Sequence, residues 1–257
     1  MRLLPLVLIA SLLATAAAAH ESWLLPAAAP AKVGQPVTLG FTSGMAFPIP
    51  DTGPKPERVA HLVALMMCDE QPATIVGPAP GALEVAFTPE RKGLAVVALS
   101  LKAHPIVMAS IDVAEYFDEA DPGLDVLAAW KTVEARGEWR ETYVKNAKAL
   151  VCVETCDGED RSGMHLIGQG LEFLASEPGP APRRFRLVTP EGPRANHTVR
   201  LFVPGQPGRK LRTNAAGILD LPADVSGVFM LSAVWLRPPP SPDGSFTSDF
   251  ASIVVGR

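Results

Sequence analysis

The sequence has no run of basic residues, and its 23 lysines and arginines are outnumbered by 27 aspartates and glutamates. Proteins that hold nucleic acid through its phosphates carry a basic patch or stripe. After the first residues there is also no run of 18 or more apolar residues, the minimum for a membrane-spanning helix. We therefore expect a soluble protein that binds no nucleic acid.

Signatures of catalysis are missing as well. The sequence contains no Gly-x-Ser-x-Gly elbow, no phosphate-binding loop, no His-Glu-x-x-His and no dinucleotide-binding fingerprint. Its carboxylates are scattered over predicted loops and helix faces, which is typical of solvated surface groups. We expect a binding protein and not an enzyme.

Cysteine is scarce, with Cys68, Cys152 and Cys156 alone. Three cysteines are too few for a disulfide-built scaffold. Cys152 and Cys156 lie on one face of a predicted strand, too far apart to bond unless the chain turns between them. Cys68 could equally pair with either. We expect one bridge and one free buried thiol, with a Cys-x-x-x-Cys metal site as the alternative.

The first residues have the features of a signal peptide. Arg2 precedes an apolar stretch from Leu3 to Leu13, and small residues follow up to Ala19. The apolar stretch is too short to cross a bilayer as a helix. We expect residues 1–19 to be removed on export to the periplasm. The mature chain of 238 residues would then begin at His20 and carry a formal charge of −5, because Arg2 is lost from a total of −4.

Abundant proline and glycine, 26 and 21 residues, argue against a helical protein. Short runs rich in Val, Leu and Ile alternate with turn signals, as in antiparallel sandwiches. Residues 113–144 differ, because their apolar residues recur at spacings of three and four, which predicts helix. Asp121-Pro122-Gly123 predicts a break there, with Asp121 as a cap and Pro122 in the first helical turn.

These patterns predict a mostly β fold with two β-sandwich (immunoglobulin-like) domains. The first domain covers residues 20–112 and the second, β-rich domain covers residues 146–257. A helical connecting segment, residues 113–145, joins them.

A histidine at a mature N-terminus would offer two nitrogen atoms to one metal ion. The α-amine and imidazole Nδ1 of His20 can close a six-membered chelate ring. An α-amine has a pKa of about 7.7–8.0, so it can lose its proton to a metal near neutral pH. Amine and imidazole donors suit Ni(II), Cu(II) and Zn(II). The alternative is that the histidine is incidental, since cleavage must expose some residue.

Two further histidines are predicted in the same domain as His20. His61 opens an apolar strand and His104 ends one, just before Pro105. Strand ends are where loops place ligands, so we predict a metal site formed by His20, His61 and His104. His165 follows an acidic loop and could belong to a second, weaker site. His197 completes an Asn-x-Thr sequon, which matters only in a host that glycosylates.

Several stretches, in order, resemble motifs of one bacterial periplasmic domain-of-unknown-function family, which is grouped with NikM-like substrate-specific components of nickel uptake. The matching stretches are His20–Pro26 (HESWLLP), Glu115–Leu124, Trp139–Val151 (WRETYVKNAKALV) and Gly168–Phe173 (GQGLEF). The resemblance spans most of the mature chain. It implies two β-sandwich domains, a periplasmic location and a part in transition-metal uptake, nickel above all.

The chain departs from that family pattern near its C-terminal end. The proline-rich residues 178–182 and 238–240 weaken the match, and the cysteines are not part of the pattern. Of the predicted ligands only His20 falls on a matching position. His61 and His104 are inferred from this sequence alone.

The leading hypothesis is a periplasmic protein that captures a divalent transition metal and assists its uptake by an inner-membrane transporter. Nickel is the first candidate, and copper and zinc are the alternatives. A second hypothesis is a non-catalytic β-sandwich interaction module that binds a protein or glycan, in which His20 is incidental. A third is a copper histidine-brace protein, which would need a second histidine across the metal.

Overall fold

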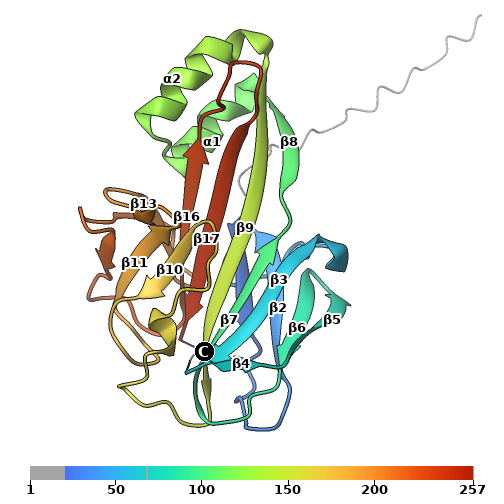
Figure 1. Ribbon diagram of the computed structural model, residues 1–257, viewed down its shortest axis with the longest axis vertical. Coiled ribbons are helices and arrows are strands. Elements are labelled where there is room, and N and C mark those ends of the chain that lie inside the picture. The colour runs from blue at the N-terminus through green and yellow to red at the C-terminus, as the bar shows by residue number, and fades with distance from the viewer. Residues whose placement is uncertain (1–20, 68, 257) are drawn as a thin grey trace, which may run out of the picture.

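The computed structural model describes residues 21–67 and 69–256. Strands dominate it, with two helices in the middle of the chain, so the predicted mostly β fold is confirmed. Figure 1 shows both helices at one end of the longest strands. Within the described residues no helix is long and apolar enough to cross a membrane.

A nine-stranded sheet joins the two halves of the chain around β9 (Glu138–Val153). β9 pairs in parallel with β17, antiparallel with β7, and antiparallel with β8 beyond the end of β7. The strands in spatial order are β14 (Arg209–Arg212), β13 (Thr198–Phe202), β16 (Phe229–Arg237), β17 (Phe246–Val255), β9, β7 (Gly93–Leu101), β3 (Val59–Met66) and β4 (Asp69–Gln71), with β8 (His104–Ala109) beside β9.

The first sandwich forms where a smaller sheet covers one face of this central sheet. Its strands are β1 (Glu21–Pro26), β2 (Val37–Gly44), β6 (Ala82–Phe87) and β5 (Ala73–Ala79). Trp23 and Phe41 from the small sheet pack against Val97 and Ala149 from the central sheet. All four are fully buried, as expected where two sheets stack on their apolar faces.

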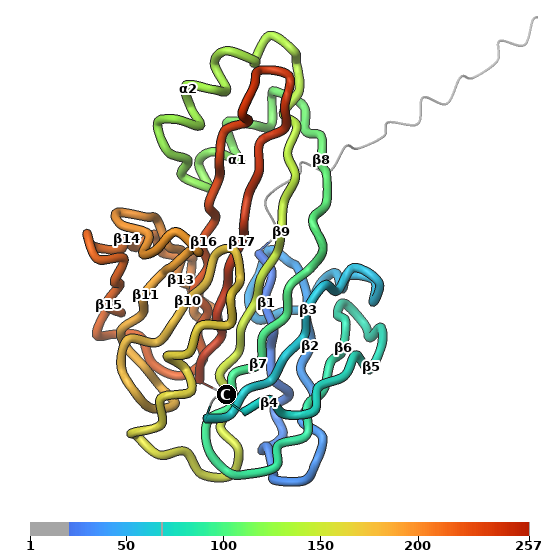
Figure 2. The backbone as a smooth tube through the Cα atoms, in the orientation of Figure 1, coloured from blue at the N-terminus to red at the C-terminus, as the bar shows by residue number. Residues whose placement is uncertain are grey.

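The second sandwich uses the opposite face of the same central sheet. Its covering strands are β10 (Glu172–Ala175), β11 (Arg184–Thr189), β12 (Gly192–Pro193) and β15 (Ile218–Asp220). Phe173 and Phe185 pack there against Leu150, Leu231 and Ile253. Figure 2 shows the two covering sheets on either side of the central strands. The two predicted sandwiches therefore share one sheet.

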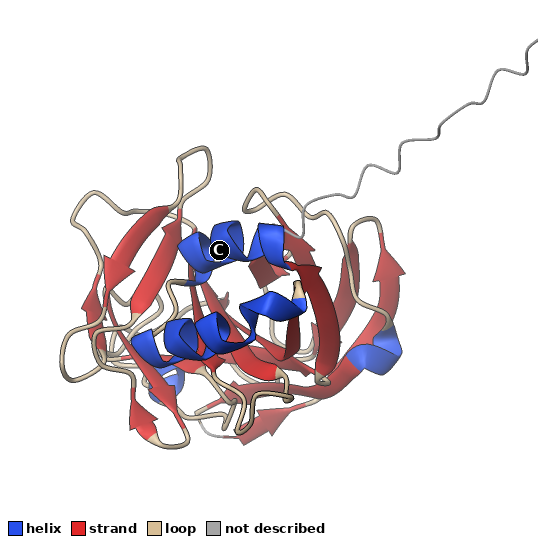
Figure 3. Ribbon diagram, turned by 90° about the horizontal axis from the view of Figure 1, so that it is seen from above, coloured by secondary structure: helices blue, strands red, loops and turns tan. Residues whose placement is uncertain are grey.

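The helices are α1 (Val113–Ala120) and α2 (Leu124–Val133), with 3-10 turns η1 (Pro56–Arg58), η2 (Ser110–Asp112), η3 (Glu134–Arg136) and η4 (Ser162–Met164) elsewhere. Seen from above, the two helices lie across the end of the sheet (Figure 3). Tyr116 and Trp130 pack on Trp139, which stacks on Phe246 with ring centroids 3.8 Å apart. This aromatic cluster fixes the helices to β9 and β17.

The break between the helices is confirmed, but the capping roles differ from those predicted. Asp121 caps the C-terminal end of α1 in a left-handed conformation with φ of 47°, and Gly123 is the N-cap of α2. Pro122 lies between the helices. Proline disfavours helical backbone in the residue before it, so α1 ends at Ala120. Asp121 is not the N-cap of α2 because its backbone is left-handed, whereas an N-cap residue is extended.

The predicted connecting segment is helical only as far as Arg136. Residues 138–145 belong to β9, so the predicted boundary at 145/146 falls inside this strand. Trp139 and Glu141 are buried while Arg140 between them is exposed, which is the period of two of a strand. The helical spacing that ends at Val133 runs directly into this alternation, which hides the change of period.

Candidate functional site

Polar side chains point from both faces of β9. Odd-numbered residues such as Ala147 and Ala149 face the first sandwich, whereas Leu150 faces the second. Because strand side chains alternate, Tyr143 and Lys145 lie on the first face and Asn146 and Lys148 on the second. The polar groups on the two faces differ in their burial and in their hydrogen-bond partners.

On the second face, Lys148 forms a buried ion pair with Glu172 of β10. Their side chains are 2% and 0% exposed. Lys148 Nζ also donates to Phe173 O at 3.1 Å, and the Glu172 carboxylate accepts the backbone N–H groups of Ile167 and Gly168 at 2.7 and 2.9 Å. Burial lowers the pKa of Lys148 to about 8 against the opposing effect of Glu172. Both charged groups of this pair are therefore held by several hydrogen bonds inside the protein.

Glu141 is a second enclosed acid, on the first face and next to the helices. Its carboxylate accepts Trp139 Nε1 at 2.6 Å, Tyr116 Oη at 3.1 Å and the hydroxyl of Ser248. Burial raises its pKa, and the three donors oppose that rise. Three ionisable residues of the WRETYVKNAKALV and GQGLEF stretches, Glu141, Lys148 and Glu172, thus hold neighbouring elements together.

Glu21, the first described residue, is buried at the start of β1. It accepts Arg200 Nη1 at 3.0 Å and the hydroxyl of Ser232. Burial raises the pKa of its carboxyl, and the positive charges of Arg200 and Lys145 lower it. Its neighbour Ser22 hydrogen-bonds Ser43 of β2 at 2.7 Å. The strand that follows His20 is therefore anchored on the first face of the sheet.

An open pocket of about 480 Å³ lies on this same face, and we call it the His104 pocket. It is bounded by η1, β2, β8 and β9, and its lining residues are Ser43, Thr52, Gly53, Pro54, Lys55, Glu57, Arg58, Leu101, His104, Tyr143 and Lys145. Lys145 Nζ donates to Ser43 Oγ at 3.3 Å. The pocket therefore reaches β2 beside the start of β1.

His104 is exposed on the wall of the pocket, where its ring meets the Tyr143 ring edge-on with centroids 5.6 Å apart. Loss of hydration and the positive charge of Arg58 lower its pKa, which favours the neutral form of the imidazole. Burial likewise lowers the pKa of Lys145 to about 8, against the effect of Glu21. A neutral imidazole has a nitrogen lone pair available for a metal.

His61 is exposed on the opposite face of the sheet. It pairs with Ser100 of β7, and Ser100 pairs in turn with Asn146. His104 pairs with Tyr143, three residues from Asn146 along β9. Directly paired residues share a face, so the sheet separates His61 from His104. The structure does not bring these two predicted ligands together.

The third predicted ligand, His20, lies outside the described residues. Among residues 21–67 and 69–256 no group of three or more histidines, cysteines, aspartates or glutamates is placed to hold a metal ion. The ligand set His20, His61 and His104 stays a prediction.

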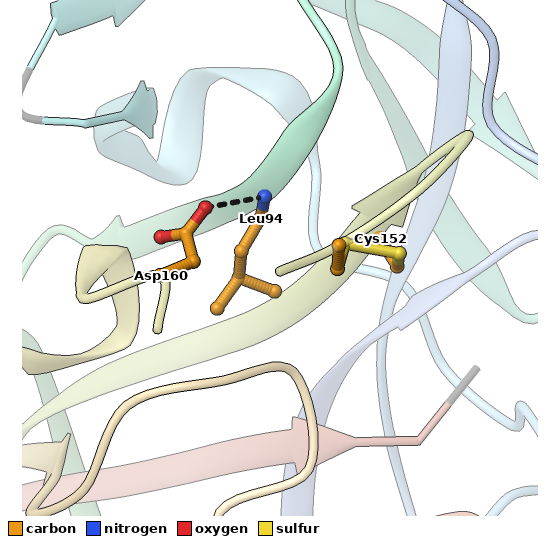
Figure 4. Close-up of a disulfide and its surroundings, with 4 residues drawn as sticks. Leu94, Cys152 and Asp160 are labelled. Atoms are coloured by element: carbon orange, nitrogen blue, oxygen red, sulfur yellow. Dashed lines mark hydrogen bonds between the residues drawn. A yellow bond between two sulfur atoms is a disulfide. The ribbon is translucent and has the colours of Figure 1, made fainter. Parts of the chain in front are cut away.

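Cys152 and Cys156 form a disulfide, with Cα atoms 5.7 Å apart (Figure 4). The chain makes the turn that this pairing requires at Glu154, whose φ is 57°. Cys68 lies outside the described residues. Because both thiols of the Cys-x-x-x-Cys pair are bonded to each other, they do not form the alternative metal site.

His165 lines a larger cavity of about 740 Å³ beside this disulfide, together with the acidic residues Asp157, Glu159 and Asp160. Asp160 stabilises the fold, because its carboxylate accepts the backbone N–H of Leu94 at 2.9 Å (Figure 4). It also accepts the backbone N–H of Ser162 at 2.8 Å. Asp160 thus has a structural role, and the described residues around His165 do not form a group of three or more ligands placed to hold a metal ion.

His197 is enclosed between the helices and β16. Its Nε2 lies 3.0 Å from Val234 O, and its backbone N–H donates to Thr213 Oγ1 at 2.8 Å. Burial, aided by the charge of Arg194, lowers the pKa of His197 to about 4. This imidazole acts as a packed, neutral structural group.

No protein-family model matches the sequence, and no curated protein matches it. Among solved structures, the D0-D1 domain of intimin matches at 11% identity, covering 92% of this chain and 98% of that chain with a TM-score of 0.22. A likeness at this TM-score supports no inference about this chain.

Sequence reasoning missed the cationic part of the His104 pocket, Lys55, Arg58 and Lys145. One signal was available: Tyr143 and Lys145 are two apart on a strand and so share a face. Lys55 and Arg58 come from η1, whose position beside β8 depends on long-range pairing, as shown by Arg58 O accepting Lys102 N at 2.7 Å.

Proposed function

We propose that this chain is a periplasmic metal-binding protein that captures a divalent transition metal, nickel first, and assists its uptake by a membrane transporter. The position of His104 carries the proposal. Its imidazole lines an open pocket on the face of the central sheet where β1 begins with Glu21, the residue bonded to His20.

Contacts between β1 and the pocket support this pairing of His20 with His104. Ser22 bonds Ser43, and Ser43 accepts from Lys145, which lines the pocket beside Tyr143 and His104. The amine and imidazole of His20 with the imidazole of His104 would give three nitrogen donors. Nitrogen donors of this kind suit Ni(II), Cu(II) and Zn(II).

Isothermal titration of protein purified from the periplasm tests the proposal, once N-terminal sequencing has shown that the chain begins at His20. We expect one nickel ion per chain. His20→Ala should abolish binding, and His104→Ala should weaken it by about tenfold or more, a loss of about 1.4 kcal/mol. His61→Ala is the matched control and should bind as the parent does.

Absence of nickel, copper and zinc binding by the cleaved protein, or equal binding after His20→Ala, would sink the proposal. If His61→Ala lost nickel binding and His104→Ala kept it, the site would lie on the other face of the sheet.

Exposed apolar residues near the helices favour a second candidate, a β-sandwich module that binds another protein. Ile111 and Leu124 are each 85% exposed and Val107 is 65% exposed. Large exposed apolar groups are common at interaction sites when they gather in one patch. In this case the double variant Ile111→Glu with Leu124→Glu should abolish binding to the partner protein and leave nickel affinity unchanged. Adding one residue before His20 should not change binding to the partner protein.

A further inference from the structure

A smaller pocket of about 230 Å³ lies between the helices and β16, and we call it the Arg194 pocket. Its walls come from the connection between α1 and α2, the residues that join β12 to β13, and parts of β14 and β16. Four charged residues line it: Asp121, Asp125, Arg194 and Arg212. The volume is below the range of about 300–1,000 Å³ that is typical for drug-sized ligands, so the pocket suits a smaller molecule.

Two of these four charged groups are paired with each other. Arg212 Nη1 lies 3.4 Å from Asp121 Oδ2, and the hydroxyl of Thr198 donates to the same carboxylate oxygen. The other two, Asp125 and Arg194, take part in no ion pair between described residues. The Arg194 pocket therefore presents one carboxylate and one guanidinium group that do not form an ion pair with each other.

The guanidinium group of Arg194 is held by stacking. Its central carbon lies 4.5 Å from the centroid of the Trp235 ring, which is the geometry of a cation–π contact. Loss of hydration lowers the pKa of Arg194, and the positive charge of Arg237 adds to that effect. The negative charges of Glu191 and Asp125 oppose it. Arg194 thus feels the charge of Asp125 without direct contact, and its planar fork of N–H groups suits a carboxylate.

The carboxylate of Asp125 is turned back toward the start of α2. Asp125 lies in the first turn of this helix, whose N-cap is Gly123. A Cβ atom at Gly123 would come within 2.5 Å of Asp125 Oδ1, so glycine leaves the room that this carboxylate occupies. Asp125 is also exposed, which lets a ligand reach it from solvent. Two opposite charges that line one small pocket without touching leave part of their attraction for a ligand.

We propose that the Arg194 pocket binds a small zwitterion, the ammonium carboxylate form of a free α-amino acid. The carboxylate of the ligand binds the terminal N–H groups of Arg194, and its ammonium group binds the carboxylate of Asp125. A plain anion is opposed by Asp125, and a plain cation is opposed by Arg194. This inference does not depend on the proposed metal function, because the Arg194 pocket and the His104 pocket share no lining residue.

An NMR titration of the ¹⁵N-labelled protein with L-alanine tests the inference. We expect saturable shifts in the backbone N–H signals of Asn196 and His197 and in the indole N–H signal of Trp235, because all three residues line the pocket. Two analogues serve as matched controls. L-Lactate has a hydroxyl in place of the ammonium group, and L-alaninamide has an uncharged amide in place of the carboxylate. Each should bind more weakly by about tenfold or more, since each lacks one charge-assisted contact.

Arg194→Gln and Asp125→Asn should each weaken the binding of L-alanine by about tenfold or more. Their effects on the analogues should differ. Arg194→Gln should weaken L-lactate and not L-alaninamide, and Asp125→Asn should weaken L-alaninamide and not L-lactate. Damage to the fold would weaken all three ligands together. Arg186→Gln on β11 and Glu115→Gln on α1 remove exposed charges outside the pocket and should change none of the affinities.

Several results would overturn the inference. If L-lactate bound as tightly as L-alanine, the pocket would be a plain anion site, and equal binding of L-alaninamide would make it a plain cation site. The absence of saturable shifts with L-alanine would show that the pocket takes no amino acid. Losses after Arg186→Gln or Glu115→Gln equal to those after Arg194→Gln would show that binding occurs elsewhere. None of these results bears on nickel binding.

Discussion

Lys148 and Lys145 lie three residues apart on β9, on opposite faces of the same sheet, and burial lowers the pKa of each to about 8. Lys148 is enclosed between two layers and paired with Glu172, whereas Lys145 lines an open pocket. The histidines divide in the same way, because His197 is packed against Val234 O and His104 is exposed. A shifted pKa therefore does not distinguish a side chain that lines an open pocket from one that is packed inside the protein. Exposure to solvent distinguishes them.

The strongest way to sharpen this comparison is to remove Lys148. Lys148→Met leaves the Glu172 carboxylate buried without its counter-charge, which costs about 3–5 kcal/mol of the free energy of unfolding. Urea denaturation measures the loss. Adding Glu172→Gln should recover part of it, because the neutral amide removes the buried charge while its one oxygen can still accept the N–H groups of Gly168 and Gln169. No recovery would show that the charge itself was not the cost.

His197 predicts a dependence of stability on pH. Its folded pKa of about 4 lies below the unfolded value of 6.5, so the unfolded chain binds more protons between these pH values. Stability should therefore fall as pH drops from 6.5 to 4, by on the order of 3 kcal/mol. Urea titrations across this range should show a flatter profile for His197→Gln.

The exposed His104 is the control for that experiment. His104→Gln should leave the pH profile close to that of the parent, because an exposed imidazole gains its proton without unfolding. If both variants flattened the dependence of stability on pH to the same extent, the distinction between the packed His197 and the exposed His104 would be wrong.

Removing the disulfide at the end of β9 should lower the free energy of unfolding by less than the changes at Lys148 and His197. Its loop joins residues only four apart, and closing a loop this short contributes about 2 kcal/mol in the chain-entropy model. The double variant Cys152→Ser with Cys156→Ser should lose this much in urea denaturation. It should keep its nickel affinity, because the His104 pocket includes neither cysteine. Loss of nickel binding would contradict the separation of the two regions.

The smallest effect on stability is expected for Lys145→Met. Among the contacts of the described residues, the side chain gives up a hydrogen bond of 3.3 Å to Ser43 and cation contacts to the Tyr143 and Phe250 rings at 5.7 and 5.8 Å. Partly solvated contacts of this kind contribute about 1 kcal/mol or less. A loss as large as that of Lys148→Met would remove the contrast between the two lysines.

The fold class followed from the sequence because turn residues and short apolar runs are local signals. The sharing of one sheet did not, since the parallel pairing of β9 with β17 joins residues about a hundred positions apart in the chain. The change from helix to strand near Arg136 was hidden because the apolar spacing of α2 runs straight into the alternation of β9.

For the site, the sequence predicted that His104 ends a strand, whereas it begins β8, and it treated His61 as an equal candidate. Both histidines are exposed, and their separation depends on the register of three strands, which no local pattern reports. The same long-range register brings Arg58 and Lys145 to the pocket. Conversely, the sequence suggested that the carboxylates are solvated surface groups, and only the structure shows that Glu141 and Glu172 are buried and hydrogen-bonded.

X-ray absorption spectroscopy of the nickel-loaded protein tests the central claim most directly, because it counts the imidazole rings around the metal. The account predicts rings from His20 and His104, the loss of one ring in His104→Ala, and an unchanged spectrum in His61→Ala. A spectrum that changes in His61→Ala and not in His104→Ala would contradict the assignment of the site to the His104 pocket.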